Sequence, residues 1–307
     1  MWIRAFVAVF LLLAATGTSV ARAATVAFAT PSIDRWNSAV NPTPGYRATA
    51  SAFAAAAPGS SGFEDLFTTQ LLGFDTTASV TAGLGDANYQ IVSATLTLAL
   101  DPATSYTYDP TYDALGTYTS GDPDDPGRPV ELYGNGFRGG FTGATYVEGS
   151  PSTPGTPWGP PGAPFAAGTR FAYPTDAAGG ALPDVSNHLT DGFEATPFAV
   201  GQVAGLAAGD LVAGPGAMVF DMVLSADVIA YLQAGLDDGF LGFHVASKLV
   251  PVGSGNSDFP SFYNRESGLG ASSLSLDLVV VPEPASGSLV VLGLLLVAAA
   301  RRGTRRD

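Results

Sequence analysis

Four stretches of the chain alternate apolar and polar side chains with a period of two, a pattern that predicts β-strands buried on one face. The clearest covers residues 91–100 (IVSATLTLAL), and residues 272–280 (SSLSLDLVV) repeat it and are expected to form the last strand of the domain. Residues 217–224 and 240–247 predict two further strands. In the first stretch, the face expected to be buried consists of Val92, Ala94, Leu96, Leu98 and Leu100.

One helix is expected between the strands at 217–224 and 240–247. Ser225 can cap its N-terminus, and Asp227 suits the positive end of the helix dipole. Gly235 or Gly239 is expected to end the helix. We predict that this helix covers an open end of the strand layers through an apolar stripe of Val228, Ile229, Leu232 and Leu236.

The stretch from residue 101 to 200 carries no long alternating run. Residues 151–164 hold six prolines in fourteen positions, which excludes a central strand and favours polyproline II. Because the strands on both sides need each other to close a sheet, 101–200 is interpreted as a long surface insertion in one domain, residues 24–281. The predicted fold is all-β, a jelly-roll-like β-sandwich with one short helix and a long Pro/Gly-rich insertion.

Residues 1–23 have the features of a secretory signal peptide. Arg4 precedes an apolar run from Ala5 to Ala15, and Ala21-Arg22-Ala23 forms an A-x-A cleavage pattern. The apolar run has no polar face, so a buried amphipathic helix is the less favoured interpretation. The expected partners are the Sec translocon and signal peptidase, and the mature chain is expected to begin at Ala24.

Residues 282–307 follow a three-part order. Pro282, Glu283 and Pro284 are followed by an apolar run from Leu289 to Ala300, which passes for a membrane span when it is counted from Gly287. The basic cluster Arg301, Arg302, Arg305 and Arg306 then closes the chain and favours a cytoplasmic C-terminal end.

This tail resembles the PEP-CTERM sorting signal of Gram-negative bacteria that build exopolysaccharide. The resemblance implies that exosortase, a membrane protease-transpeptidase, processes the protein. It also implies a transient inner-membrane anchor followed by a place at the cell surface or in the extracellular matrix, with exopolysaccharide as a candidate partner.

The composition narrows the possible functions. Six of the 13 Lys and Arg residues and two of the 27 Asp and Glu residues lie in the terminal segments, which leaves residues 24–281 with a net charge of about −18. Such a surface repels nucleic acid and anionic lipid unless cations intervene, so a nucleic-acid partner is excluded. The absence of cysteine removes disulfides, thiolate nucleophiles and iron–sulfur clusters.

Parts of the domain resemble the jelly-roll modules of the DNRLRE and carbohydrate-binding type. The resemblance rests on the strand 91–100, on the strand-helix-strand block 217–247, and on the polar loop Asn264-Arg265-Glu266-Ser267 before the closing strand. It covers about half of residues 24–281. The Tyr-rich and Pro-rich insertion departs from the pattern of these modules. No ligand site is therefore carried over from the resemblance.

Two features are candidate binding sites. Asp122, Asp124 and Asp125 place three carboxylates in one turn, which suits calcium, although Tyr133 stands where an EF-hand loop needs glutamate and a solvated acidic turn is the alternative. Exposed aromatic faces can stack on sugar rings, and half-buried packing is again the alternative. The candidate sugar-stacking residues are Tyr106, Tyr108, Tyr112 and Trp158.

Motifs for catalysis are weak. Residues 134–139 (GNGFRG) match G-x-G-x-x-G, but no helix is expected after them, so a glycine-rich β turn is the preferred interpretation. His244 is expected to be partly buried with its ring nitrogens hydrogen-bonded. His188 is not expected to act as a catalytic base, because the sequence contains no G-x-S-x-G motif that would supply a nucleophilic serine. We therefore expect a non-enzymatic, structural or adhesive surface protein. A carbohydrate-binding module or polysaccharide-acting enzyme on the same sandwich is the alternative.

Overall fold

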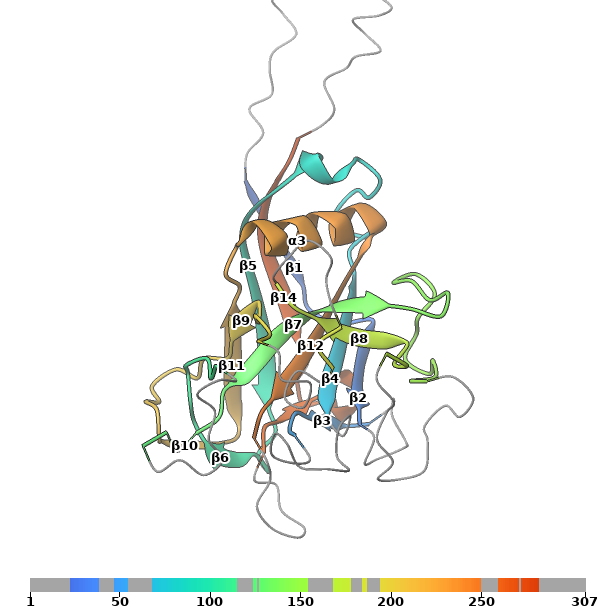
Figure 1. Cartoon of the computed structure of the whole chain (residues 1–307). Coiled ribbons are helices and arrows are strands. Elements are labelled where there is room, and N and C mark those ends of the chain that lie inside the picture. Colours follow the sequence, from blue (N-terminus) through green and yellow to red (C-terminus); the bar gives the residue numbers. More distant parts are fainter. Residues whose placement is uncertain are drawn as a thin grey trace, which may run out of the picture.

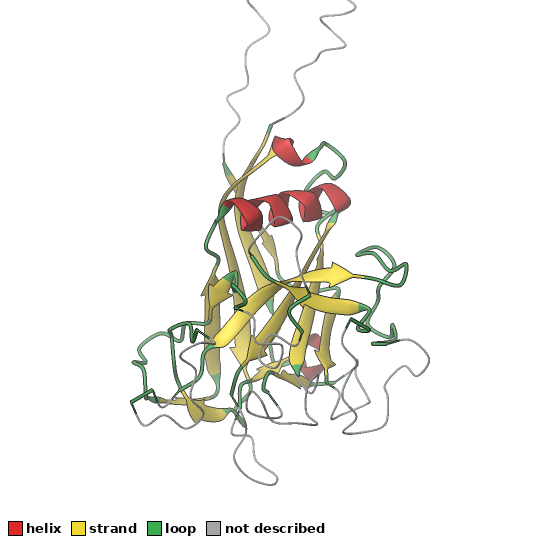
Figure 2. Ribbon diagram, viewed as in Figure 1, coloured by secondary structure: helices red, strands yellow, loops and turns green. Residues whose placement is uncertain are grey.

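The computed structural model describes residues 23–38, 47–54, 68–114, 124–125, 127–153, 168–177, 184–186, 194–249, 259–270 and 272–281. These residues form two antiparallel sheets with one α-helix at an end (Figures 1 and 2). The fold is therefore mostly β and sandwich-like, as the alternating stretches predict.

The first sheet, sheet A, contains both ends of the described chain. Its strand order is β1 (Ala24–Phe28), β14 (Ser273–Val280), β5 (Tyr89–Leu100), β13 (Ser261–Tyr263) and β3 (Thr49–Ser51), and β11 (Gly216–Asp221) also pairs with β5. Strands β5, β11 and β14 are the alternating stretches of the sequence, so these predictions are confirmed.

The second sheet, sheet B, has the order β2 (Ile33–Asn37), β4 (Thr69–Asp75), β12 (Phe240–Ser247), β7 (Val130–Phe137) and β8 (Ala172–Thr175), with β9 (Ala199–Val200) also on β7. A short ribbon of β6 (Ser105–Thr107) and β10 (Leu211–Ala213) lies outside both sheets. Strand β12 is the predicted strand at 240–247.

The apolar core lies between the two sheets. Sheet A contributes Leu96, Leu98 and Leu276, and sheet B contributes Leu72 and Phe243, all fully buried in one contiguous cluster. Burial of these inner faces supplies the main stabilisation, because the chain has no disulfide.

The helix α3 (Ala226–Asp238) closes one end of the sandwich, as predicted. The backbone N–H of Val228 donates to Ser225 Oγ at 3.3 Å, and Gly239 ends the helix in the left-handed conformation. Val228, Leu232 and Leu236 are buried, whereas Ile229 is only half-buried. The helix contacts β5 of sheet A and β12 of sheet B, so it joins the two layers (Figure 1).

The prediction for the strand 91–100 is wrong at Val92, which points towards solvent. Val92 is 57% exposed, although it was expected on the buried face. The register of β5 against β14 shifts by one residue here, since Asp277 pairs with Ser93 and Leu278 with Ile91. A β-bulge inserts one unpaired residue and so turns Val92 outward.

The prediction that residues 101–200 form a surface insertion is wrong for β7 and β8. Strand β7 pairs with β12 on one side and β8 on the other, in the interior of sheet B. Residues Val130 to Asn135 are all buried, and the alternation of Val130 and Leu132 with Glu131 is too short to stand out as a long run. Most of the proline-rich stretch, residues 154–164, lies outside the described residues.

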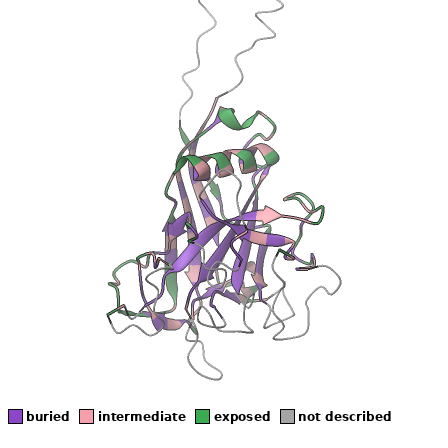
Figure 3. Ribbon diagram, viewed as in Figure 1, coloured by how far each residue is buried: buried purple, intermediate pink, exposed green. Residues whose placement is uncertain are grey.

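Sheet B is covered on both faces. Its outer face lies beneath connecting segments: the guanidinium of Arg35 on β2 donates to the backbone oxygens of Glu148 and Ser150, and Phe137 of β7 packs on Tyr146 with ring centroids 5.4 Å apart. Figure 3 shows these strands as buried and the outer side of α3 as largely exposed. The protein thus has a second, more polar interior outside sheet B.

Candidate functional site

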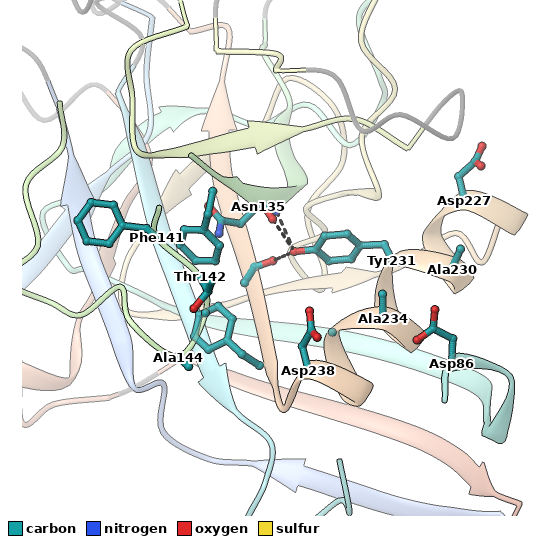
Figure 4. A pocket seen from close by; sticks show the side chains of 15 residues that line it. Asp86, Asn135, Phe141, Thr142, Ala144, Asp227, Ala230, Tyr231, Ala234 and Asp238 are labelled. Atoms are coloured by element: carbon teal, nitrogen blue, oxygen red, sulfur yellow. Dashed lines mark hydrogen bonds between the residues drawn. The ribbon is translucent and has the colours of Figure 1, made fainter. Parts of the chain in front are cut away.

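A groove of about 710 Å³ lies between α3 and the segment that follows β7. We call it the α3 groove. Figure 4 shows α3 on one side of it and residues 141–144 on the other. The size is within the range of ligand sites, which is roughly 300–1,000 Å³. It is lined by Asp86, Asn135, Phe137, Phe141, Thr142, Gly143, Ala144, Asp227, Ala230, Tyr231, Ala234, Gly235, Asp238, Phe240 and Gly242.

Aromatic rings form one side of the α3 groove. Phe137 packs on Phe240 with centroids 5.9 Å apart, and Phe141 stacks edge-on against Tyr146 at 5.3 Å. Phe137, Phe141 and Phe240 are half-buried, so part of each ring remains accessible. Aromatic faces of this kind suit the apolar faces of sugar rings.

The floor of the groove is held by Tyr231. Its hydroxyl accepts a hydrogen bond from the backbone N–H of Asn135 at 2.8 Å and donates one to the oxygen of Gly242 (Figure 4). Burial raises the pKa of Tyr231 well above its usual range, so the phenol stays neutral. Tyr231 therefore ties α3 to β7 and β12 and gives the groove a fixed shape.

Carboxylates line the helix side of the groove. Asp227, Ala230, Ala234 and Asp238 recur at helical spacing along α3 and form one stripe, and Asp86 of η1 (Asp86–Asn88) lies beside it. Asp227 and Asp238 are separated by roughly 16 Å along the helix axis at about 1.5 Å per residue. This is wider than the roughly 5–9.5 Å between the paired carboxylates of glycosidases, so these two cannot form such a pair.

The predicted calcium turn is only partly assembled. Asp122 lies outside the described residues, and Asp124 is exposed. Asp125 instead meets two carboxylates from another segment, Asp109 and Asp113, and one oxygen from each of the three lies within 4.8 Å of the others. The sequence analysis missed this partnership because sixteen positions separate Asp109 from Asp125 along the chain, and nothing in the sequence shows that the two segments meet.

The predicted sugar-stacking tyrosines do not form a platform. Tyr106 is 4% exposed and Tyr108 2%, and both belong to the apolar core, so they offer no open ring face. The ring of Tyr112 lies under Lys248 Nζ, 4.4 Å from its centroid. Trp158 lies outside the described residues. Half-buried aromatic rings instead line the α3 groove, and the sequence analysis did not single them out.

His244 is a satisfied core residue, as expected, and its burial is complete. Its Nδ1 lies 3.0 Å from Thr69 Oγ1, and its Nε2 lies 2.9 Å from Asn135 Oδ1. Burial lowers the pKa of His244 well below its usual value, so the ring is neutral. His188 lies outside the described residues.

The GNGFRG stretch is part of strand β7 and the turn after it, and no helix follows. This excludes the dinucleotide-binding geometry, which needs a helix N-terminus. The expected turn is displaced to residues 139–140, because Gly134 and Gly136 lie within the strand. A Cβ on Gly136 would lie 2.5 Å from the ring of Tyr173, and one on Gly134 would lie 2.7 Å from the ring of Phe198.

All basic side chains of the domain are buried or half-buried. All seven Lys and Arg residues between Ala24 and Val281 belong to the described part of the chain, and none is exposed. Arg35, Arg128, Arg170 and Lys248 are at most 5% exposed. Exposed acidic residues remain on the surface: Asp75, Asp86, Asp124, Glu194, Asp210, Asp221, Asp238 and Glu266. The surface of the described domain is therefore acidic without an exposed compensating cation.

The half-buried Arg265 forms ion pairs with two buried acids. Arg265 Nε lies 3.4 Å from Asp34 Oδ1, and its Nη2 lies 3.5 Å from Glu148 Oε2. Burial raises the pKa of Asp34 to about 7, against the lowering effect of the hydrogen bond from the backbone of Arg265. Neither Asp34 nor Glu148 lines the α3 groove. We interpret this cluster as a structural link between β2, the segment at 146–152 and η2 (Arg265–Ser267).

The sorting residues fall at the edges of the described chain. Ala23 and Ala24 are described, and β1 begins at Ala24. Outside the described residues lie Ala21, Pro282, Glu283, Pro284 and the cluster Arg301, Arg302, Arg305 and Arg306. No helix within the described ranges is long and apolar enough to cross a membrane.

Comparison with known proteins adds no family to this picture. Neither a scan against protein-family models nor a search of curated proteins finds a match to this chain.

Proposed function

We propose that the protein is an exported, exosortase-sorted protein of the cell surface or the exopolysaccharide matrix, with a structural or adhesive and non-enzymatic role. A jelly-roll-like topology is part of this proposal. The observation that supports the role most is the placement of charge: none of the seven Lys and Arg side chains of the domain is exposed, whereas eight Asp and Glu residues are. Such a surface favours contact with neutral glycans, or with anionic ones through bridging cations.

The position of the chain ends also supports the proposal. Ala24 pairs with Leu278 at the edge of sheet A, so β1 begins where β14 ends, at the end of the sandwich that carries α3 (Figure 1). Both sorting segments would therefore leave from one end of the domain. The other end, with the β6–β10 ribbon, would project away from the membrane.

The sorting step is tested by changing Pro282, Glu283 and Pro284 together to alanine in an exosortase-bearing host. We expect the parent to reach the surface fraction and the variant to stay unprocessed in the inner membrane, because prolines keep this segment extended for a protease cleft. A control with Ser286→Ala and Ser288→Ala changes neighbouring residues and should be processed normally. Normal processing of the triple variant would disprove this step.

A second candidate function, glycan binding, is favoured by the α3 groove. Three half-buried phenylalanines and a carboxylate rim face the same cavity. We expect neutral or amine-bearing oligosaccharides to bind and uronic-acid polymers to be repelled.

A glycan array followed by titration of the best ligand tests this function. Phe141→Ala should weaken binding about 3- to 10-fold, the loss of one aromatic stacking contact. Leu269→Ala removes an exposed apolar side chain that does not line the groove and is the matched control. Equal affinities for the two variants would place the glycan outside the groove.

A further inference from the structure

The carboxylates Asp109, Asp113 and Asp125 meet away from the α3 groove. Asp109 and Asp113 lie on the segment that follows β6, and Asp125 lies on the segment that leads into β7. One oxygen from each lies within 4.8 Å of the other two. Oxygens that share one calcium ion, at about 2.3–2.6 Å from it, can lie at most about 5 Å apart, so this spacing suits a single ion.

Two buried oxygens in this cluster have no hydrogen-bond donor among the described residues. Asp109 is 3% exposed and Asp113 8%; within the described chain no group donates to Asp109 Oδ2, and Asp113 Oδ2 has only the ion-pair contact with Arg128 Nη1 at 3.5 Å. The other oxygen of Asp109 is used, since it accepts from the N–H and O–H of Thr111 at 2.9 and 2.6 Å. A buried carboxylate oxygen without a donor is costly, and a cation would satisfy it.

The charges around the cluster do not balance. Arg128 Nη1 lies 3.1 Å from Asp125 Oδ2 and 3.5 Å from Asp113 Oδ2. Lys248 donates to the backbone oxygen of Asp113 at 2.6 Å, but its charge is matched by Glu131 Oε1 at 2.9 Å. When all three are ionised, three carboxylates against one arginine leave two negative charges, which one divalent cation would neutralise.

The two acidic segments are brought together by a close backbone contact. A Cβ on Gly127 would lie 2.6 Å from Asp109 Cβ and 2.8 Å from the backbone oxygen of Tyr108. Glycine therefore allows the segment with Asp125 to approach Asp109. The close approach brings like charges together, which needs compensation.

We propose that Asp109, Asp113 and Asp125 bind one divalent cation of the calcium type, at the end of the sandwich away from α3. The donor set is oxygen only, which calcium prefers, and water can complete its shell of 6–8 ligands. The cation would clamp the segment after β6 to the start of β7.

The proposal is tested on the full chain by titration with calcium and magnesium and by thermal unfolding after chelation and re-addition. Calcium at about 100 times its dissociation constant should raise Tm by roughly 5–10 °C. Magnesium, which needs shorter bonds of about 2.0–2.1 Å and holds its waters, should act more weakly.

Two variants separate a metal site from a purely structural cluster. Asp109→Asn should abolish most of the calcium shift, while the chelated protein should melt no lower than the parent, because like-charge repulsion is relieved. Asp124→Asn, an exposed neighbour outside the triad, should keep the full shift. If Asp109→Asn does not fold, Asp125→Asn replaces it with the same expectation.

Three results would overturn the proposal. The first is a Tm that moves by less than about 1 °C in millimolar calcium. The second is a calcium shift that Asp124→Asn abolishes and Asp109→Asn retains, which would place the ion on the 122–125 turn alone. The third is a lowered Tm of chelated Asp109→Asn with no loss of the calcium shift, which would make the triad a structural contact only.

Discussion

Sheet A and sheet B share the apolar core but differ on their outer faces. The outer face of sheet A carries small polar side chains, such as Ser93 and Thr95, that hydrogen-bond to Asp277 and Asp221 near solvent. The outer face of sheet B carries charged and aromatic groups, such as Arg35 and Glu131, that are fully buried under connecting segments. The outer face of sheet A is therefore in contact with water, whereas the outer face of sheet B is covered by a second, more polar interior.

This difference indicates where the removal of a single polar side chain should destabilise the protein most. Removing a polar group at the surface costs little because water replaces the lost partner. Removing one partner of a buried ion pair leaves the other charge without compensation. We therefore expect the outer face of sheet B to be far more sensitive than that of sheet A.

The largest effect is expected at Lys248, whose Nζ lies 2.9 Å from Glu131 Oε1 with both side chains fully buried. Lys248→Met should lower the free energy of unfolding by about 3–5 kcal/mol, because Glu131 then keeps a buried charge. Urea unfolding measures the change. Adding Glu131→Leu should recover much of the loss.

The matched control is Thr95→Ala on the outer face of sheet A, which breaks the exposed bond to Asp221. It should change the free energy of unfolding by no more than about 0.5 kcal/mol. Similar losses for Lys248→Met and Thr95→Ala would show that the two outer faces are energetically alike.

A smaller, pH-dependent effect is expected at Asp34 on β2. Its folded pKa of about 7 is above the unfolded value, so the folded state binds this proton more tightly. Stability should therefore be highest below the unfolded pKa and fall as the pH rises towards 7. Asp34→Asn should remove this slope and gain about 2 kcal/mol relative to the parent over that range. This is about half of what ~1.4 kcal/mol per pH unit gives, because Arg265 beside it is partly solvated.

Urea midpoints of parent and Asp34→Asn from pH 4 to pH 8 measure this difference. Asp75→Asn is a control of opposite sign, since hydrogen bonds from Thr77 lower the pKa of Asp75. That contribution is present above the unfolded pKa and lost as the pH falls through the folded one. Parallel pH profiles for the parent and Asp34→Asn would contradict the buried-carboxylate explanation.

The smallest effect is expected at Ser225, the cap of the helix that joins the two sheets. Ser225→Ala removes the acceptor for the Val228 N–H and should cost about 1 kcal/mol, whereas Ser225→Asp should keep most of the stability. Thermal unfolding measures both. A loss as large as that of Lys248→Met would mean that α3, rather than the outer face of sheet B, limits stability.

The α3 groove was partly predictable. Asp227, Ala230, Ala234 and Asp238 recur at helical spacing along one side of a helix that the sequence placed correctly, and the two alanines leave that side without bulky side chains. The facing rings of Phe137 and Phe141 could not be assigned from sequence, because they belong to a stretch read as an insertion. When the two sides of a groove come from segments far apart in the chain, no fixed spacing of residues in the sequence reveals it.

The sequence alone determined the elements whose environment changes along the chain. Strands β5 and β14 alternate because one face meets the core and the other meets water, and α3 carries its cap and its apolar stripe in consecutive residues. Only the tertiary structure showed which strands are covered on both faces and which distant segments meet. Strand β7 is buried on both faces although the charged Glu131 separates Val130 from Leu132, and Asp109 meets Asp125 because Gly127 lets the two segments touch. The alternation of apolar and polar residues along the chain indicates which side chains meet water. Contacts between distant segments are set by the packing of the whole chain.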